Sequence, residues 1–270
     1  MKKVVIAWIL SLVLVLSVVG VASAVTDGEL DGEGHPQVVL LLMEVGGEPM
    51  YRCSATLLSP TVVLTAGHCT SNYPDEPYSG MRVFTESDVD NGNNNYPYKG
   101  KNSVEAKAWY THPLFETGPF FLHDVGVVIL KKPIHLDTYG ELPTVNQLDE
   151  LASQVSNPEI IFTSVGYGLQ KAFPDAASWK DQADRIRMVA YPKLNQINTG
   201  FTGDFSLLLS NNAATGGTCF GDSGGPNFLY DTNIVAGVTS YGLNWACGGT
   251  GGVFRMDRQD VLDFVEPFLE

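Results

Sequence analysis

The sequence predicts an all-β protein of two antiparallel six-stranded β-barrels, followed by a short C-terminal helix. Three observations predict this fold. From Gln37 onward, short apolar runs rich in β-branched residues are separated by Gly, Pro, Asn and Asp, as in barrels and sandwiches. No internal repeat of roughly 20–50 residues is visible. The chain that follows residue 24 is long enough for two barrels of roughly 120 residues each.

The expected strands recur along the chain after residue 37. They include residues 38–42, 61–64, 125–130, 160–162, 234–238 and 252–254. A connection that carries Pro, Asn and acidic residues is expected around residues 140–150. We therefore expect the first barrel within residues 25–145 and the second barrel, with the C-terminal helix, within residues 146–270.

The C-terminus has the spacing of a helix. Its apolar residues recur at i, i+1, i+3, i+4, i+7 and i+8, namely Val261, Leu262, Phe264, Val265, Phe268 and Leu269. Pro267 lies inside this pattern. Because proline has no backbone N–H, we expect it to end the helix early.

Residues 1–24 predict a secretory signal peptide. Met1-Lys2-Lys3 precedes an apolar run over residues 4–21, and Ala22-Ser23-Ala24 forms a small-residue cleavage site. An uncleaved membrane anchor is the alternative, because about 20 apolar residues span a bilayer. The Ala-Ser-Ala ending favours cleavage. We expect a secreted chain, extracellular or periplasmic, that begins Val25-Thr26-Asp27-Gly28.

The chain is acidic, with a formal net charge of −14. Signal cleavage removes Lys2 and Lys3 and no acidic residue, so the mature chain is more acidic still. Nucleic acids and anionic membranes bind basic patches, so both are disfavoured as partners. We expect a monomer without stable membrane association after cleavage.

A serine lies among three glycines in the segment Cys219-Phe220-Gly221-Asp222-Ser223-Gly224-Gly225-Pro226. Glycine permits turns that a Cβ forbids, so Ser223 can present its hydroxyl to a carbonyl group. The N–H groups of Gly221 and Ser223 would then face the developing oxyanion. The alternatives are an incidental Ser in a Gly-rich turn and the nucleophile elbow of α/β-hydrolases.

The positions of the histidines exclude the elbow. That fold places its catalytic His after the Ser, whereas all five histidines precede Ser223. His68, in Leu64-Thr65-Ala66-Gly67-His68-Cys69, follows a β-rich run and is the candidate base. Asp124 heads the apolar run 125–130 and would orient His68; its alternative role is to cap that strand. His123 is a second candidate base but lacks the Ala-Gly-His-Cys setting.

These segments resemble the trypsin/chymotrypsin-fold serine endopeptidases, closest in style to bacterial trypsin-like members. The resemblance covers nearly everything after residue 24. It implies a Ser223-His68-Asp124 triad in the cleft between the barrels, and hydrolysis of peptide bonds through an acyl-enzyme. Five segments carry it: Thr65-Ala66-Gly67-His68-Cys69, His123-Asp124-Val125-Gly126, Val165-Gly166-Tyr167-Gly168, Gly221-Asp222-Ser223-Gly224-Gly225-Pro226 and Ser240-Tyr241-Gly242.

The resemblance also implies roles for the new N-terminus and the cysteines. The α-amine of Val25 would fold inward and pair with Asp222; the alternative is a cleavage site with no activating role. Four cysteines allow three pairings. The resemblance implies two bridges, Cys53 with Cys69 and Cys219 with Cys247.

Four further residues are expected at the substrate pocket. The resemblance places Gly217 at its floor, where a carboxylate for Arg or Lys would stand in a trypsin-like pocket, and Gly242 and Gly252 at its walls. Ser240 to Gly242 would offer a backbone edge to the substrate. An apolar or aromatic side chain before the scissile bond is therefore expected. Ser54-Ala55-Thr56 departs from the family's common Gly-Gly-Ser, which leaves contacts beyond the scissile bond open.

No cofactor or metal is expected. The acidic and amide segment 88–95 could suggest a calcium loop, but it lacks the Gly and Glu of an EF-hand at the sixth and twelfth positions. Two rival functions remain: a binding or adhesion protein on the protease fold, and an esterase with the same triad.

Overall fold

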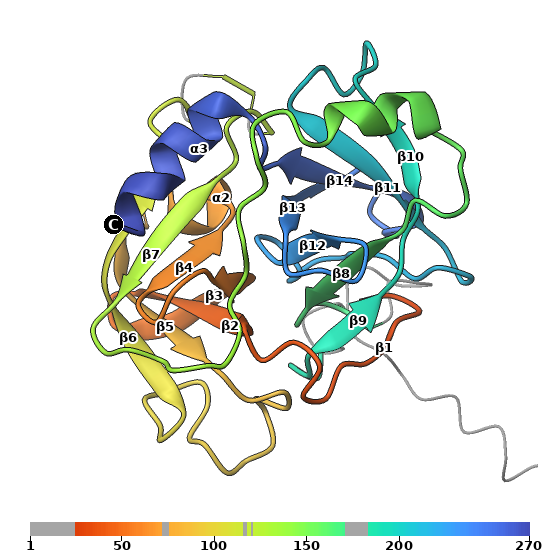
Figure 1. Cartoon of the computed structure of the whole chain (residues 1–270). Helices are drawn as coiled ribbons and strands as arrows, with labels where there is room; N and C mark the ends of the chain where they lie inside the picture. The colour runs from red at the N-terminus through yellow and green to blue at the C-terminus, as the bar shows by residue number, and fades with distance from the viewer. Residues whose placement is uncertain (1–24, 72–75, 116–117, 120, 171–182) are drawn as a thin grey trace, which may run out of the picture.

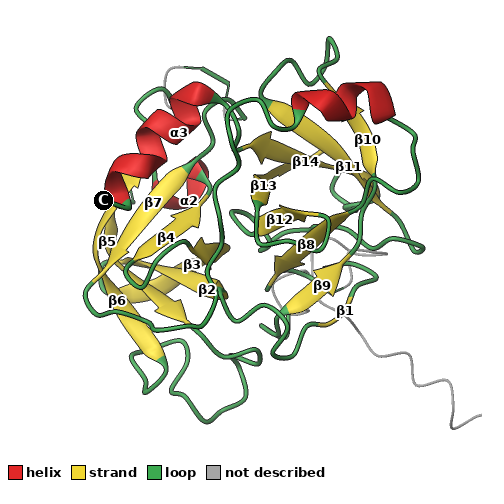
Figure 2. Cartoon of the chain, viewed as in Figure 1, coloured by secondary structure: helices red, strands yellow, loops and turns green. Residues whose placement is uncertain are grey.

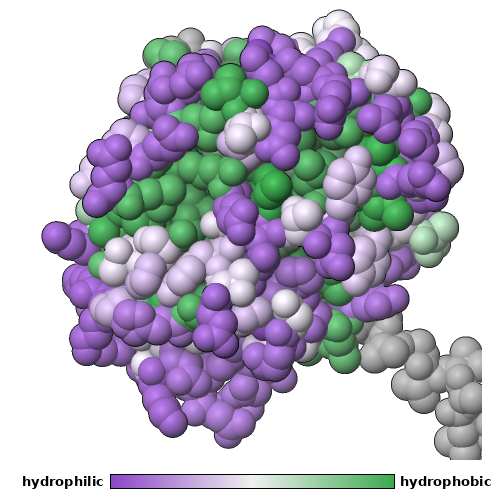
Figure 3. Space-filling model, viewed as in Figure 1, coloured by the Kyte–Doolittle hydropathy of each residue, from purple (hydrophilic) through white to green (hydrophobic). Residues whose placement is uncertain are grey.

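The computed structural model describes residues 25–71, 76–115, 118–119, 121–170 and 183–270 (Figure 1). The expected signal peptide, residues 1–24, lies outside the described residues. Across the described ranges, no helix has the length and apolar character needed to cross a membrane. Strands predominate in both halves of the molecule (Figure 2). Hydrophilic side chains cover much of the face in Figure 3, in keeping with the acidic composition.

The first half is a closed barrel of six antiparallel strands in the order β2-β3-β4-β7-β6-β5. Its strands are β2 (Val38–Val45), β3 (Glu48–Leu57), β4 (Val62–Thr65), β5 (Tyr78–Phe84), β6 (Ser103–Thr111) and β7 (Gly126–Leu130). Val39 and Leu41 of β2 belong to one core cluster of this barrel, whereas Val38 and Leu40 belong to a cluster shared with the second half. Both faces of β2 are therefore buried, which explains its unbroken apolar run.

The second half is an eight-stranded sheet in the order β1-β9-β8-β12-β13-β14-β11-β10. Its strands are β1 (Glu29–Leu30), β8 (Phe162–Gly166), β9 (Met188–Ala190), β10 (Leu194–Ile197), β11 (Ser206–Asn211), β12 (Pro226–Leu229), β13 (Val235–Gly242) and β14 (Gly249–Arg255). The predicted all-β fold is confirmed, and the first half forms the closed six-stranded barrel that was expected. The second sheet has eight strands rather than the six expected, because the short β1 and β10 add to its two edges.

Helices are few and short in the described ranges. They are α2 (Gly67–Thr70), the 3-10 helix η2 (Asp149–Gln154), α3 (Gln259–Val265) and the 3-10 turn η4 (Glu266–Phe268). The predicted C-terminal helix is confirmed, and it changes to 3-10 geometry in the turn that contains Pro267. The boundary expected at residue 145 falls between β7 and η2.

Each end of the described chain packs on the opposite half. The strand β1 pairs with β9 of the second sheet. The helix α3 was expected on the second barrel, but it lies along the first barrel (Figure 1). Its Phe264 ring lies 5.1 Å from the His112 ring, and Phe268 lies 4.9 Å from Tyr110 of β6. The apolar face of α3 thus covers the first barrel, because aromatic rings there complete its core.

Candidate active site

His68 and Asp124 meet at one end of the first barrel. His68 lies in α2, directly after β4, and Asp124 lies two residues before β7, which pairs with β4. Nδ1 of His68 lies 2.9 Å from Oδ2 and 3.1 Å from Oδ1 of Asp124. The backbone N–H of His68 donates to Oδ1 over 2.9 Å. These contacts orient the imidazole and leave Nε2 as the nitrogen able to take a proton.

A hydroxyl from the second sheet also holds Asp124. The carboxylate is fully buried, and Ser240 of β13 donates its Oγ hydrogen to Oδ2 over 2.5 Å. Burial disfavours the charged imidazole of His68, but the charge of Asp124 and their hydrogen bond outweigh it. The pKa of His68 is therefore raised above its ordinary value, which makes it a stronger base. Ser240 was expected at the substrate pocket, and its bond to Asp124 was not foreseen.

Ser223 lies on the loop before β12 and lines the same cavity as His68. Gly221 and Gly224 have φ of +97° and +75°, a region that side chains rarely adopt. A Cβ on Gly224 would lie 2.0 Å from Oγ1 of Thr65. Within the described residues, the N–H groups of Gly221 and Ser223 have no protein acceptor, so a ligand oxygen can use both.

Ser54 joins the nucleophile loop to the rest of the site, and sequence reasoning missed this role. Its N–H donates to the carbonyl of Ser223 over 2.8 Å, and its hydroxyl donates to the carbonyl of Gly221 over 3.0 Å. The same oxygen accepts the N–H of Tyr167 over 2.9 Å. From the sequence, Ser54 is visible only as a departure from a family pattern. Its hydrogen-bond partners lie more than a hundred residues away in the chain, so no local pattern indicates them.

His123, the other candidate base, faces away from this pair. Its ring stacks on His112 at 4.8 Å and an interplanar angle of 10°, and its Nδ1 lies 3.1 Å from Asp260 of α3. The ligand atoms of these three residues lie close enough together to be considered for a metal. Two nearly parallel, stacked rings do not direct their nitrogens at one ion, so this arrangement favours a helix contact.

Asp222 is buried in the loop beside Ser223. It accepts the N–H groups of Gly168 and Cys219, each over 2.8 Å. Burial raises the pKa of Asp222 to about 7, although these bonds and the charge of Arg185 act in the opposite direction. A buried carboxyl of this kind is stabilised in its charged form by a cation.

The segment that starts at Val25 is docked in the second sheet. Val25 is fully buried in a cluster with Met188 and Ala190. The carbonyl of Thr26 accepts the N–H of Gly217 over 3.1 Å, and its hydroxyl donates to Asn211 over 2.9 Å. In this chain the nitrogen of Val25 is a peptide nitrogen, and among the described residues no hydrogen bond joins it to Asp222.

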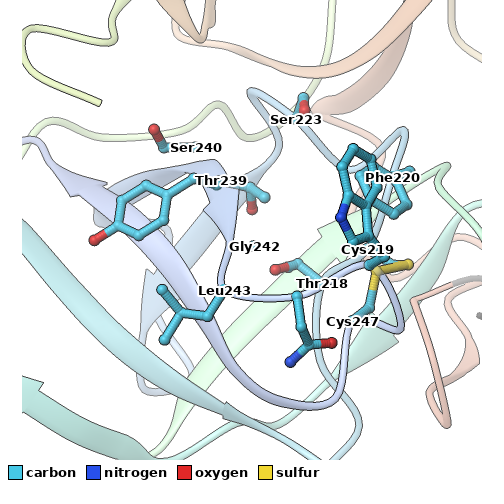
Figure 4. Close-up of a pocket in the computed structure, with 12 residues that line it drawn as sticks. Thr218, Cys219, Phe220, Ser223, Thr239, Ser240, Gly242, Leu243 and Cys247 are labelled. Atoms are coloured by element: carbon cyan, nitrogen blue, oxygen red, sulfur yellow. A yellow bond between two sulfur atoms is a disulfide. The ribbon is translucent and has the colours of Figure 1, made fainter. Parts of the chain in front are cut away.

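A cavity of about 390 Å³ opens on one side of Ser223 (Figure 4). Ser240 and Gly242 line it, as expected. Gly217 does not, because a Cβ there would point at Asn211, 2.3 Å from its Cγ. Gly252 does not either, since its Cβ would lie 2.3 Å from the ring of Tyr241.

The residues next to these two glycines are Thr218 and Gly251. Thr218, next to Gly217, lines the cavity. Gly251 pairs with Gly242 across β13 and β14, and a Cβ on it would lie 3.0 Å from Oγ1 of Thr218. A register irregularity between Thr239 and Tyr241 sets which glycine of β14 lies opposite Gly242, and the sequence pattern does not reveal it.

Both disulfides have the pairing that the resemblance implied. Cys53 is bonded to Cys69 beside His68, and Cys219 to Cys247 beside Ser223. Each bridge therefore restrains a loop that carries a candidate catalytic residue.

The segment 88–95, considered above as a calcium loop, forms turns. The buried amide of Asn94 donates to Glu86 over 2.6 Å and to the carbonyl of Val89 over 2.7 Å. The amide of Asn91 donates to the carbonyl of Asp88 over 2.6 Å. The polar side chains of this segment thus hold its own backbone.

Comparison with known proteins identifies the family. The Trypsin family model matches residues 29–263. Venom serine protease Bi-VSP from Bombus ignitus is 25% identical over 242 residues, which cover 83% of this chain and 61% of that protein. A trypsin from Saccharopolyspora erythraea is 27% identical over 233 residues, which cover 82% of this chain and 88% of that protein.

A solved structure gives the same result for the fold. The structure titled HL collagenase has a TM-score of 0.67 and 21% identity, and the match covers 90% of this chain and 98% of that one. The two sequence relatives come from an animal and a bacterium, so the bacterial type stays a prediction. With the family model matching most of its length, the chain belongs to the trypsin family of serine endopeptidases.

Proposed function

We propose that the protein is an exported serine endopeptidase that cleaves peptide bonds through an acyl-enzyme on Ser223. One observation carries this proposal: His68, oriented by Asp124, lines the same cavity as Ser223. The unpartnered N–H groups of Gly221 and Ser223 in the described chain add a site for the oxyanion. Binding of nucleic acid forms no part of this proposal; the partner is a polypeptide substrate, and the protein acts as a monomer.

In the proposed reaction, Nε2 of His68 takes the proton of Ser223 as its Oγ attacks the scissile carbonyl. Asp124 stabilises the imidazolium, and the hydroxyl of Ser240 stabilises Asp124. The N–H groups of Gly221 and Ser223 hold the oxyanion, each lowering the barrier by about 3–4 kcal/mol. His68 then protonates the leaving amine, and water releases the acyl group by the same steps.

Signal cleavage is proposed to activate the enzyme. A cut after Ala24 frees the α-amine of Val25, whose side chain is already buried beside β9. Asp222 is buried and forms no ion pair with a side chain among the described residues. An ammonium partner would therefore stabilise its charged form. The pair would stabilise the loop that carries Gly221 and Ser223.

The substrate preference is proposed to be apolar or aromatic rather than basic before the scissile bond. Phe220, Leu243 and Trp245 line the cavity beside Ser223, and the described residues that line it include no carboxylate. An Arg or Lys side chain in this cavity would lose water without gaining a partner, which costs several kcal/mol.

A fluorophosphonate probe, which labels activated serines, tests the proposal on the secreted protein. We expect labelling of the wild type and of Ser153→Ala, a control at an exposed serine, and none of Ser223→Ala. A wild type that stays unlabelled would instead favour the binding-protein alternative. Hydrolysis of an ester but not of its matched peptide would favour the esterase.

A further inference from the structure

A second cavity also borders Ser223, and its volume is about 670 Å³. Ser223 and Phe220 line both cavities, whereas His68 and Gly221 line only this one. Because His68 delivers the proton to the leaving amine in the proposed reaction, the leaving group departs on its side. This cavity is therefore placed to hold the residues that follow the scissile bond.

Two arginines line this cavity, Arg52 of β3 and Arg185. The chain has six arginines, and the other four are ion-paired: Arg82, Arg187, Arg255 and Arg258. Within the described chain, Arg52 and Arg185 have no carboxylate partner at ion-pair distance. Among the described residues, the two guanidinium groups without a carboxylate partner are thus the two beside the nucleophile.

Neutral groups hold the two guanidinium groups in place. Nε of Arg52 donates to the hydroxyl of Tyr96, and Nη1 donates to the carbonyl of Met50 over 3.2 Å. The guanidinium carbon of Arg52 lies 5.6 Å from the centre of the Tyr96 ring. The side chain of Arg185 is also hydrogen-bonded to the side chain of Tyr96. These contacts use some of the N–H groups of each arginine and leave others for a ligand.

Arg185 lies close to the oxyanion site. Its Nη1 is 3.8 Å from the position that a Cβ on Gly221 would occupy, and its backbone has a φ of +55°. Burial lowers the pKa of Arg185, and the neighbouring charge of Arg52 adds to that effect. Among the described residues that line this cavity, the acidic one is Asp90, which is exposed, so two arginines face one carboxylate.

We propose that this cavity selects a carboxylate on the leaving-group side of the scissile bond. The carboxylate is an Asp or Glu side chain, or the substrate's own C-terminus. Arginine suits this role because its planar fork matches a carboxylate. The inference rests on the proposed peptidase function and adds a second specificity element to it.

Peptides that are identical up to the scissile bond test the inference. They carry Glu, Gln or Lys at the first or second position after the bond, with an amidated end. We expect kcat/KM for the Glu peptide to exceed that for the Gln peptide by about tenfold at low salt, as for a hydrogen bond to a charged group. The Lys peptide should have the lowest kcat/KM of the three. A fourth peptide, with Gln and a free C-terminal carboxylate, separates the two sources of charge.

The variants Arg52→Gln and Arg185→Gln should each reduce the Glu-to-Gln ratio, and the double variant should bring it to about one. Because the charge of Arg185 also reaches Asp222, the variants are judged by this ratio and not by absolute rate. Lys132→Gln removes one exposed positive charge elsewhere and should keep the ratio. Arg185→Lys should retain part of it.

A wild-type ratio of one for both carboxylate sources, or a ratio that survives in the double variant, overturns the inference. Fluorophosphonate labelling in the same samples separates this failure from a failure of the proposed function. A labelled enzyme without carboxylate preference refutes only the leaving-group pocket. An unlabelled protein refutes the peptidase proposal on which the pocket depends.

Discussion

The proposed activating contact between Val25 and Asp222 can be tested by changing where the chain begins. A protein that starts at Ser23 keeps every residue of the docked segment but carries its α-amine two residues away from Val25. The nitrogen of Val25 is then a peptide nitrogen, as in the chain before cleavage. We expect this extended protein to fold and to be much less active than the protein that starts at Val25.

The environment of Asp222 sets the size of the effect. Burial raises its pKa from 3.8 to about 7, and a shift of about three units corresponds to about 4 kcal/mol. This is the cost of ionising Asp222 in the ordered loop without the amine of Val25, with the charge of Arg185 already included. Above pH 7, the ordered loop of the extended protein can therefore be disfavoured by up to about a thousandfold.

The sign of the pH dependence follows from the same shift. Without the amine, the folded pKa of Asp222 lies above the unfolded value, so the folded state binds more protons between about pH 4 and 7. The free energy of unfolding of the extended protein should fall as pH rises through that window. The activity advantage of the Val25 form should grow as pH rises from about 4 to 7, level off above that, and shrink once the amine itself loses its proton.

The assay compares kcat/KM of the two forms on one peptide substrate, after mass spectrometry has verified each N-terminus. A third protein, which starts at residue 25 with Val25→Ile, keeps the amine and should retain activity. Thermal unfolding shows whether the extended form is folded. Equal activity of the extended and Val25 forms over the whole pH range would refute the reasoning.

Three further predictions address the remaining contacts. Asp124→Asn should lower kcat by about 10⁴, since an amide cannot hold the tautomer of His68 that Ser223 requires; unchanged pre-steady-state acylation would contradict this. Ser240→Ala removes the hydroxyl bond to Asp124 and should lower kcat about tenfold with little change in KM, as steady-state kinetics can check. Arg187→Met removes one of the two ionic partners of the buried Asp31 carboxylate and leaves only His35, so it should lower the free energy of unfolding by about 3–5 kcal/mol, measured by denaturant titration; a loss under 1 kcal/mol would argue against this ion pair.

Local patterns account for what could be predicted at the site. His68 and Ser223 lie in short segments whose glycines and cysteines are readable without a structure. The structure places His68 beside Asp124 and on one cavity with Ser223, while their catalytic roles stay a prediction. The order of these residues along the chain was enough to reject the α/β-hydrolase alternative.

Residues that act across the two sheets could not be predicted. The hydroxyl of Ser54 donates a hydrogen bond to the carbonyl of Gly221, which lies 167 residues further along the chain. A register irregularity in β13 places Gly251 rather than Gly252 opposite Gly242, and Thr218 rather than Gly217 lines the substrate cavity. Neither feature has a signature within a short window of sequence.

By itself, the sequence determined the all-β class, the C-terminal helix and the candidate catalytic residues, because alternation, periodicity and motif are properties of neighbouring residues. Tertiary structure decided which half each chain end joins, since α3 covers the first barrel and β1 extends the second sheet. It also decided that Arg52 and Arg185, far apart in the chain, face one cavity. Packing creates such contacts between distant segments, and their energies depend on burial that arises only when the two halves close together.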